Sequence, residues 1–170
     1  APSALRALND IKLIDDYVYV AGMRRQVYRR LSNGNIWERY DEGMLVSKIS
    51  KEISGFLSID GFNNSEIYAV GYGGEIWYFN GKSWKKVDTP TNLRLESIHC
   101  FNGEYAIAVG HAGIILRGRK DVWEIIPQDE TMETFWDVDS IRKTIYITTD
   151  VGIIYKIENN KLIEIDTGFP

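Results

Sequence analysis

The chain has 170 residues, of which 44% are hydrophobic and 12% aromatic, a composition that excludes a disordered protein and suffices to bury a core. Its net charge of −4 argues against non-specific nucleic-acid binding, and no apolar run approaches the roughly 18–20 residues of a membrane span. The single cysteine, Cys100, excludes an internal disulfide, which suits a reducing compartment, so we expect a cytoplasmic protein.

The first part of the chain reads as four short strands. They are an apolar run at 11–14, a second run at 17–21 that ends at Gly22, an apolar pair at 27–28 and a last strand at 37–40. The turn between the second and third strands holds Arg24-Arg25, where later turns hold small residues. We interpret the extra length at 42–53 as a long connection to the next unit.

The second unit is the clearest, and over 66–87 it reads E-I-Y-A-V-G-Y-G-G-E-I-W-Y-F-N-G-K-S-W-K-K-V. A turn at Gly73-Gly74 joins two apolar strands, and Asn80-Gly81 turns the chain again before Trp84 opens another strand. Asn-Gly between alternating apolar residues predicts a type I′ turn, because both residues accept a positive φ.

The third and fourth units repeat this pattern. A small residue ends the second strand of each unit and a large residue opens its last strand. The small residues are Gly22, Gly71, Gly110 and Thr149, and the large ones are Trp37, Trp84, Trp123 and Leu162. Successive small residues lie 49, 39 and 39 positions apart. A period near 40 in all-strand units is the signature of a β-propeller. We therefore predict a single all-β domain of four antiparallel four-stranded blades, at approximately 8–41, 54–88, 93–127 and 133–167.

The blades are expected to bury their faces against one another, because a lone four-stranded sheet cannot bury both faces. The second strands at 17–21 and 105–109 are nearly continuous apolar runs, as expected for strands covered on both sides. The tryptophans that open the last strands recur at a fixed position, so we interpret them as packing between blades. Valine at Gly71 or Gly110 is expected to destabilise a crowded strand end through strain or overpacking.

The repeated A-V-G-x-x-G-x-[IV]-[WYL], followed by W-x-x-[VI], resembles the bacterial β-propellers grouped as BNR-like or YVTN-like repeat proteins. It also resembles the propeller of photosystem assembly factors. The resemblance covers residues from about 8 to 168 and implies a binding platform rather than a particular activity. The sialidase Asp-box, S-x-D-x-G-x-x-W, is absent from the sequence, as is the Trp-Asp repeat signature with its Gly-His pair.

Groups suited to catalysis or metal binding are few. His99 and Cys100 are neighbours on a predicted strand and therefore point to opposite faces, so they cannot form one catalytic pair or chelate one metal directly. His111 falls in a predicted turn. We expect no metal and no cofactor. The glycines at 71–74 precede no helix, which excludes a phosphate-binding loop.

The turns between second and third strands of a propeller lie on the same face as the connections between blades, and this face is the predicted binding site. Arg24-Arg25 departs most from the pattern there, because a non-glycine residue in a left-handed conformation costs about 1–2 kcal/mol. Arginine is enriched at interface hot spots, although a solvated pair in a different turn is the alternative. Alanine at both arginines is expected to weaken binding and leave folding intact. The predicted binding residues are Arg24, Arg25, Tyr72, Glu75, Arg94, His111, Trp136 and Asp150.

A face of mixed charge with aromatic residues suits a protein partner, and we expect neither nucleic acid nor a membrane as partner. The leading hypothesis is a non-enzymatic propeller that binds another protein, as a bacterial immunity or assembly factor. Two alternatives stay open. Paired carboxylates, as around Glu133 and Asp137, would suit a glycosidase or lyase, and exposed tryptophans would suit a carbohydrate-binding module.

The last expectation concerns closure of the ring. All four units hold their strands in order, so no strand is exchanged between the chain ends, and the sequence begins without Met and ends like a connection between blades. We expect an open arc of four blades, part of a larger propeller, whose exposed end faces must be covered. A second copy, a missing part of the propeller or another protein could cover them, and a closed four-bladed ring is the alternative.

Overall fold

The computed structural model describes residues 7–31, 33–44, 46 and 53–168. Four antiparallel sheets, each built from four consecutive strands, account for its regular structure. We call these sheets blades 1 to 4. Their strands are β1 (Leu8–Ile14), β2 (Tyr17–Gly22), β3 (Gln26–Leu31), β4 (Trp37–Arg39), β5 (Phe56–Asn63), β6 (Glu66–Gly71), β7 (Ile76–Phe79), β8 (Trp84–Lys86), β9 (Leu95–Phe101), β10 (Tyr105–Gly110), β11 (Ile115–Arg119), β12 (Val122–Ile125), β13 (Phe135–Ile141), β14 (Thr144–Thr149), β15 (Ile154–Glu158) and β16 (Lys161–Glu164).

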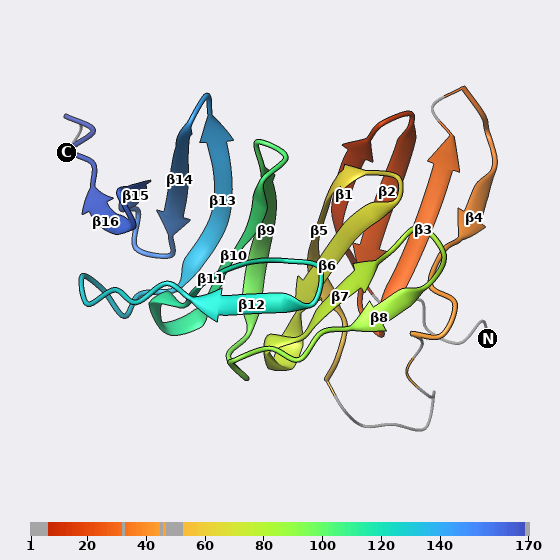
Figure 1. Cartoon of the computed structure of the whole chain (residues 1–170), viewed down its shortest axis with the longest axis horizontal. Coiled ribbons are helices and arrows are strands. Elements are labelled where there is room, and N and C mark those ends of the chain that lie inside the picture. The colour runs from red at the N-terminus through yellow and green to blue at the C-terminus, as the bar shows by residue number, and fades with distance from the viewer. Residues whose placement is uncertain (1–6, 32, 45, 47–52, 169–170) are drawn as a thin grey trace.

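The blades stand in a row, with blade 1 at one end and blade 4 at the other (Figure 1). The first strands of neighbouring blades lie side by side, β1 against β5, β5 against β9 and β9 against β13. The only helical elements among the described residues are two single turns, η1 (Tyr72–Gly74) and η2 (His111–Gly113). The all-β class and the four antiparallel blades are confirmed. No helix in this part of the chain is long and apolar enough to span a membrane.

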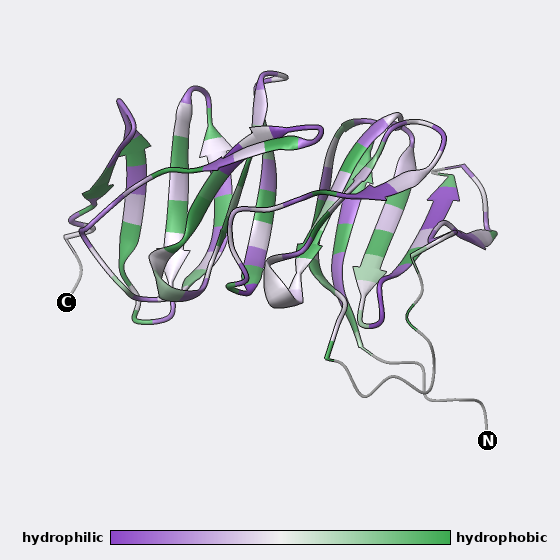
Figure 2. Ribbon diagram, turned by 60° about the horizontal axis from the view of Figure 1, so that its bottom comes forward, coloured by the Kyte–Doolittle hydropathy of each residue, from purple (hydrophilic) through white to green (hydrophobic). Residues whose placement is uncertain are grey.

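Three hydrophobic cores hold the blades together, one at each junction between neighbours. Strand β6 is buried along its whole length, because blades 1 and 3 cover its two faces. Strand β14 of blade 4 alternates between buried and accessible residues, because only one of its faces meets a neighbour. Apolar positions recur along the strands of all four blades (green in Figure 2).

The tryptophans that open the last strands also differ in burial, according to whether a neighbouring blade covers them. Trp84 and Trp123 are 8% and 9% exposed and pack in the cores, as predicted. Trp37 is 46% exposed, because no blade among the described residues covers its side of blade 1. The packing prediction is therefore wrong for Trp37, and burial of the other two leaves no platform of three tryptophans for a sugar.

The Asn80-Gly81 turn is not the predicted type I′ turn. Gly81 has a φ of 85°, but Asn80 is absent from the residues with positive φ. The Asn80 side chain instead accepts hydrogen bonds from the backbone N–H groups of Lys82 and Ser83, at 3.1 and 3.0 Å. Asparagine thus closes a four-residue connection through its side chain. Most of the predicted long connection at 42–53 lies outside the described residues.

A buried carboxylate joins blades 2 and 3. Glu66 accepts two hydrogen bonds from Arg119, at 2.8 and 3.0 Å, and one from the Tyr68 hydroxyl at 2.8 Å. Burial alone would raise the pKa of Glu66, but these donors outweigh burial and hold its pKa below the usual value. A carboxyl whose pKa is lowered in the folded state stabilises the protein above the unfolded pKa and loses this effect as pH falls through the folded pKa.

Glu66→Gln is therefore expected to destabilise the protein at pH 7, by an amount that shrinks as the pH falls below about 4.3, the ordinary pKa of glutamate. Urea denaturation of both proteins at pH 7 and at about pH 3.5 measures the difference. An equal loss at both pH values would show that the charge of Glu66 contributes nothing.

Candidate functional site

The turns and the connections between blades meet on one face, which we call the turn face. It comprises the turns 23–25, 72–74, 111–113 and 150–152, with the connections 87–94 and 127–134. The N–H of His111 donates to the Arg94 carbonyl at 3.0 Å, and that of Asp150 to Thr134 at 3.1 Å. These bonds hold the turns of blades 3 and 4 against the connections that precede those blades.

Arg25 and Glu75 are both on this face, and they bind each other. The Arg25 Nε lies 2.9 and 3.1 Å from the two carboxylate oxygens of Glu75, and Nη2 lies 2.7 Å from Oε2. The indole of Trp77 also donates to Glu75, at 3.2 Å. The two charged side chains are only 15% and 4% exposed. The pair links blade 1 to blade 2 and leaves little surface for a partner.

Arg24 and Arg25 keep the turn geometry of blades 2 and 3. Their φ angles are 62° and 60°, close to the 67° and 70° of Gly73 and Gly74. The alternative of a different turn type is therefore wrong, and the ion pair of Arg25 offsets the left-handed conformation, which costs about 1–2 kcal/mol per residue. Arg24 is half-buried and donates to the carbonyl of Val46 at 3.0 Å.

A second cluster lies where blades 2 and 3 meet. Glu96, which is buried, accepts hydrogen bonds from Arg94, and His111 Nε2 lies 3.2 Å from the same carboxylate. The Arg94 guanidinium stands over the Tyr72 ring, 5.6 Å from its centre. The structure thus brings three predicted residues together around Glu96. Glu96 is not among the residues predicted from the sequence, although Arg94 and Glu96 are two apart on an extended chain and so point to one side.

Blade 4 carries the most accessible part of the turn face. Trp136 is 49% exposed and takes the place in its strand that Glu96 takes in blade 3. Met132, in the connection 127–134, is 78% exposed, and Val151 beside the predicted Asp150 is 53% exposed. Exposed acidic side chains accompany them on the same turns and connections, namely Asp129, Glu130, Glu133 and Asp150. This part of the face combines apolar contact area with negative charge, and lies on a different blade from the Arg25–Glu75 pair.

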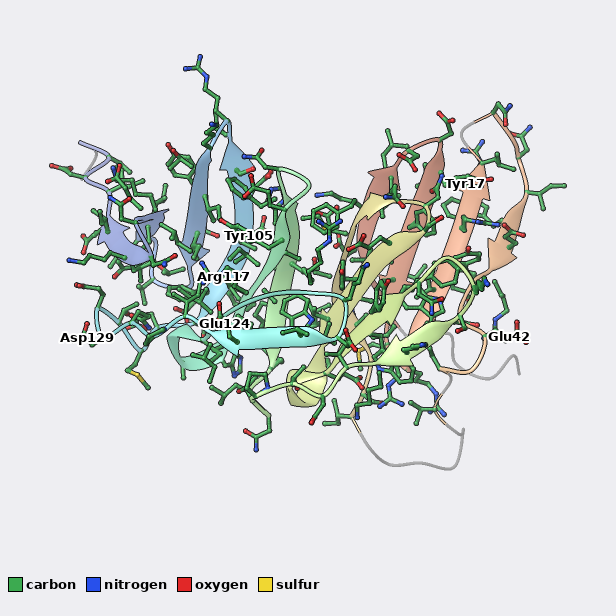
Figure 3. The ribbon with its side chains drawn as sticks, viewed as in Figure 1. Tyr17, Glu42, Tyr105, Arg117, Glu124 and Asp129 are labelled. Carbon is green, nitrogen blue, oxygen red and sulfur yellow. The ribbon has the colours of Figure 1, made fainter. Side chains whose placement is uncertain are left out.

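Two hollows of about 380 and 400 Å³ open away from this face and share Tyr105. In the first, the Arg117 guanidinium lies over the Tyr105 ring and pairs with Glu124 at 2.7 Å (Figure 3). Neither hollow is lined by two carboxylates, which a glycosidase would need.

The described residues include neither a metal-binding cluster nor a reactive thiol. No cluster of three His, Cys, Asp or Glu side chains there could hold a metal ion. His99 faces blade 4, where Nε2 is 2.8 Å from the Ser140 hydroxyl, whereas Cys100 packs in the core between blades 2 and 3. Burial raises the pKa of the Cys100 thiol far above its usual range, so the thiol is protonated and unreactive.

Comparison with known proteins gives a sequence match and several matches among solved structures. No family model matches the chain. A protein named Immune protein Tsi7, from Pseudomonas aeruginosa PAO1, is 40% identical over 161 residues, which are 95% of this chain and 52% of that protein. The solved structure described as YCF48 bound to D1 peptide aligns with a TM-score of 0.70 at 16% identity, over 96% of this chain and 56% of that one. The chain therefore spans about half the length of the curated relative, and the likeness to YCF48 supports the propeller fold alone.

Proposed function

We propose that this chain is a non-enzymatic propeller module of the immunity type, which protects a bacterial cell by binding a toxic protein. The observation that carries the proposal is the 40% identity to Immune protein Tsi7 along all four blades. The fold supports it, because propellers hold loops rigidly on one face and serve as binding platforms. The partner protein, the cytoplasmic location and the finer assignment to BNR-like or YVTN-like repeats are parts of the same proposal.

The contact surface we propose is the blade 4 part of the turn face. Trp136 is a large and half-exposed aromatic residue, the type that dominates interface energies. Met132 and Val151 extend the apolar area, and the acidic residues around them favour a partner with a basic surface. Arg94, His111 and Tyr72 form the neighbouring part, whereas Arg25 and Glu75 position the blades behind it.

The test starts by capturing binding proteins from a lysate of the source organism on the immobilised chain and identifying them by mass spectrometry. Each captured protein is then expressed in a heterologous host with and without the chain, and growth is measured. We expect one of them to arrest growth and the chain to restore it. A chain that restores growth against none of its captured partners would contradict the immunity role.

Trp136→Ala combined with Met132→Ala is expected to weaken binding of that partner at least tenfold, since hot-spot truncations cost about 2 kcal/mol or more. The matched control is Val122→Ala, because Val122 is 73% exposed on the outer strand β12, away from the turn face. Surface plasmon resonance measures the affinity of the partner for the unaltered chain, the double variant and the control. Equal affinity in the double variant and the control would place the contact surface elsewhere.

A further inference from the structure

Blades 1 and 3 carry the same ion pair over a tyrosine ring. In blade 1 the Arg29 guanidinium stands over the Tyr17 ring, 4.5 Å from its centre, and pairs with Glu38. The residues at the same strand positions of blade 3 are Tyr105, Arg117 and Glu124 (Figure 3). Each group faces the following blade, because Tyr17 packs in the core of blades 1 and 2 and Tyr105 in that of blades 3 and 4.

The two groups differ in the number of aromatic rings around the guanidinium. In blade 1 a second ring, that of Tyr40, lies 4.0 Å from the Arg29 guanidinium. Blade 3 has Ile126 at the position of Tyr40. Among the described residues, Tyr105 is therefore the only ring that Arg117 stacks on. The Arg117 side chain is accordingly 30% exposed, against 19% for Arg29.

The following blades differ in the same direction. Phe79 of blade 2 packs on the Tyr40 ring, with 4.9 Å between the ring centres, and on Trp84. Blade 4 has Ile157 at the position of Phe79 and Leu162 at that of Trp84. The junction between blades 3 and 4 thus lacks three rings that fill the junction between blades 1 and 2.

A hollow lies where these rings are missing. It has a volume of about 400 Å³, and Tyr105 of blade 3 and Ile157 of blade 4 line it. Arg117 borders it, since Nη1 donates to the Asn160 side chain at 3.0 Å. The polar residues of its lining are Lys143, Thr144, Glu158, Asn159 and Asn160. Both walls belong to described blades, so the hollow is internal to the row. We call it the junction hollow.

We propose that the junction hollow binds a small planar aromatic carboxylate. Its volume is within the range of small-molecule sites, about 300–1,000 Å³. The aromatic ring of the ligand takes the place that Tyr40 and Phe79 fill in the first junction, between Ile157 and the Arg117 guanidinium, which stacks well on π systems.

The lining also provides donors for the carboxylate. Within the described ranges, neither the Lys143 ammonium nor the amide nitrogen of Asn160 has an acceptor. The acidic residue of the lining, Glu158, pairs with Lys156 at 3.2 Å, which reduces its repulsion of an anion. Lys143 and Asn160 are therefore the groups that hold the carboxylate. The site opens away from the turn face and is independent of the proposed immunity function.

Titration of the isotope-labelled full chain with indole-3-acetate, followed by NMR, tests the site. A ligand of this size is expected to bind with a dissociation constant on the order of 1 mM. The backbone signals of Tyr105, Ile157 and Asn160 are expected to shift together. Cyclohexylacetate has the carboxylate without a π system, and indole-3-acetamide has the ring without the charge. Each is expected to bind at least about fivefold more weakly.

Two variants locate the ligand. Ile157→Phe puts the ring of blade 2 into the hollow and is expected to abolish binding without removing a charge. Arg117→Met removes the stacking cation and is expected to weaken binding at least about fivefold. The matched control is Ile36→Phe, because Ile36 is 83% exposed in the connection between β3 and β4, in blade 1. It is expected to bind like the unaltered chain.

The proposal is overturned if indole-3-acetate at about 10 mM, ten times the expected dissociation constant, leaves the signals of the hollow unchanged. Equal affinity for cyclohexylacetate would show that the ring is not recognised, and equal affinity for indole-3-acetamide that the charge is not. Unchanged binding in Arg117→Met would exclude the stacking, and this variant decides alone if Ile157→Phe does not fold. Loss in both variants, with binding kept in Ile36→Phe, supports the site.

Discussion

Valine in place of Gly110 is expected to lower the free energy of unfolding by about 3 kcal/mol, which lowers the melting midpoint by roughly 6–12 °C in a domain of this size. Gly110 ends β10 where the start of β9 crosses it. A Cβ atom at this position would collide with the carbonyl oxygen of Arg94 and lie 2.8 Å from the Leu95 Cα. Both obstacles are backbone atoms, so no change of rotamer relieves the collision.

The cause is steric and not backbone strain, because the φ of Gly110 is −177°, an extended conformation open to any residue. Gly71→Val is expected to behave alike, since its Cβ would collide with the carbonyl oxygen of Gly55. Gly34→Val is the control, because a Cβ there makes only ordinary contacts, the nearest at 3.5 Å. Thermal denaturation of all three variants measures the effect, and equal midpoints would refute the close approach.

Arg25→Met is expected to destabilise the protein by about 3 kcal/mol, because it leaves the buried carboxylate of Glu75 without its charged partner. This reverses the expectation from the sequence that alanine at Arg24 and Arg25 leaves folding intact. The double variant Arg25→Met/Glu75→Gln removes the buried charge as well, and is expected to recover most of the lost stability. Urea denaturation of the two single variants and the double variant gives the coupling energy.

An exposed ion pair, Arg117 with Glu124, serves as the control for these variants. Arg117 and Glu124 lie 2.7 Å apart with side chains 30% and 64% exposed, and such surface pairs contribute about 0–1 kcal/mol. Arg117→Met is therefore expected to change stability by less than about 1 kcal/mol. If Arg25→Met costs no more than Arg117→Met, or if the double variant is no more stable than Arg25→Met, the buried pair does not link the blades as we describe.

Local patterns were enough to predict the strands. Alternation and the spacing of Gly22, Gly71 and Gly110 placed the second strand of each blade, because a strand end crossed by backbone admits only a small side chain. Thr149 is the exception, and its hydroxyl bonds both the N–H and the carbonyl of Ile153 at 2.9 Å. The sequence correctly predicted that Asn80 lies in a turn, but for the wrong reason. Asparagine is common both at positions with positive φ and where its side chain accepts backbone N–H groups, and Asn80 does the second.

The candidate site was only partly predictable. The sequence placed Trp136, His111 and Asp150 on turns and connections, and the structure leaves Trp136 and Asp150 accessible and His111 partly so. It could not show that Arg25 and Glu75, fifty positions apart, satisfy each other, because that pairing depends on how blade 1 packs on blade 2. Glu96 could have been found from its spacing to Arg94, but its contact with His111 depends on how the η2 turn packs against β9.

By itself, the sequence determined the repeat, the strands and the face on which the turns gather, because these depend on residues close together in the chain. The tertiary structure decided which polar groups remain for a partner. Arg25 forms a buried ion pair with Glu75 and is therefore not available to a partner. Trp37, Ile11 and Asp139 are exposed, whereas the equivalent residues of other blades are buried or hydrogen-bonded to a neighbouring blade. The difference is physical: a repeat assigns the same role to equivalent residues, but their burial depends on whether a neighbouring blade covers them.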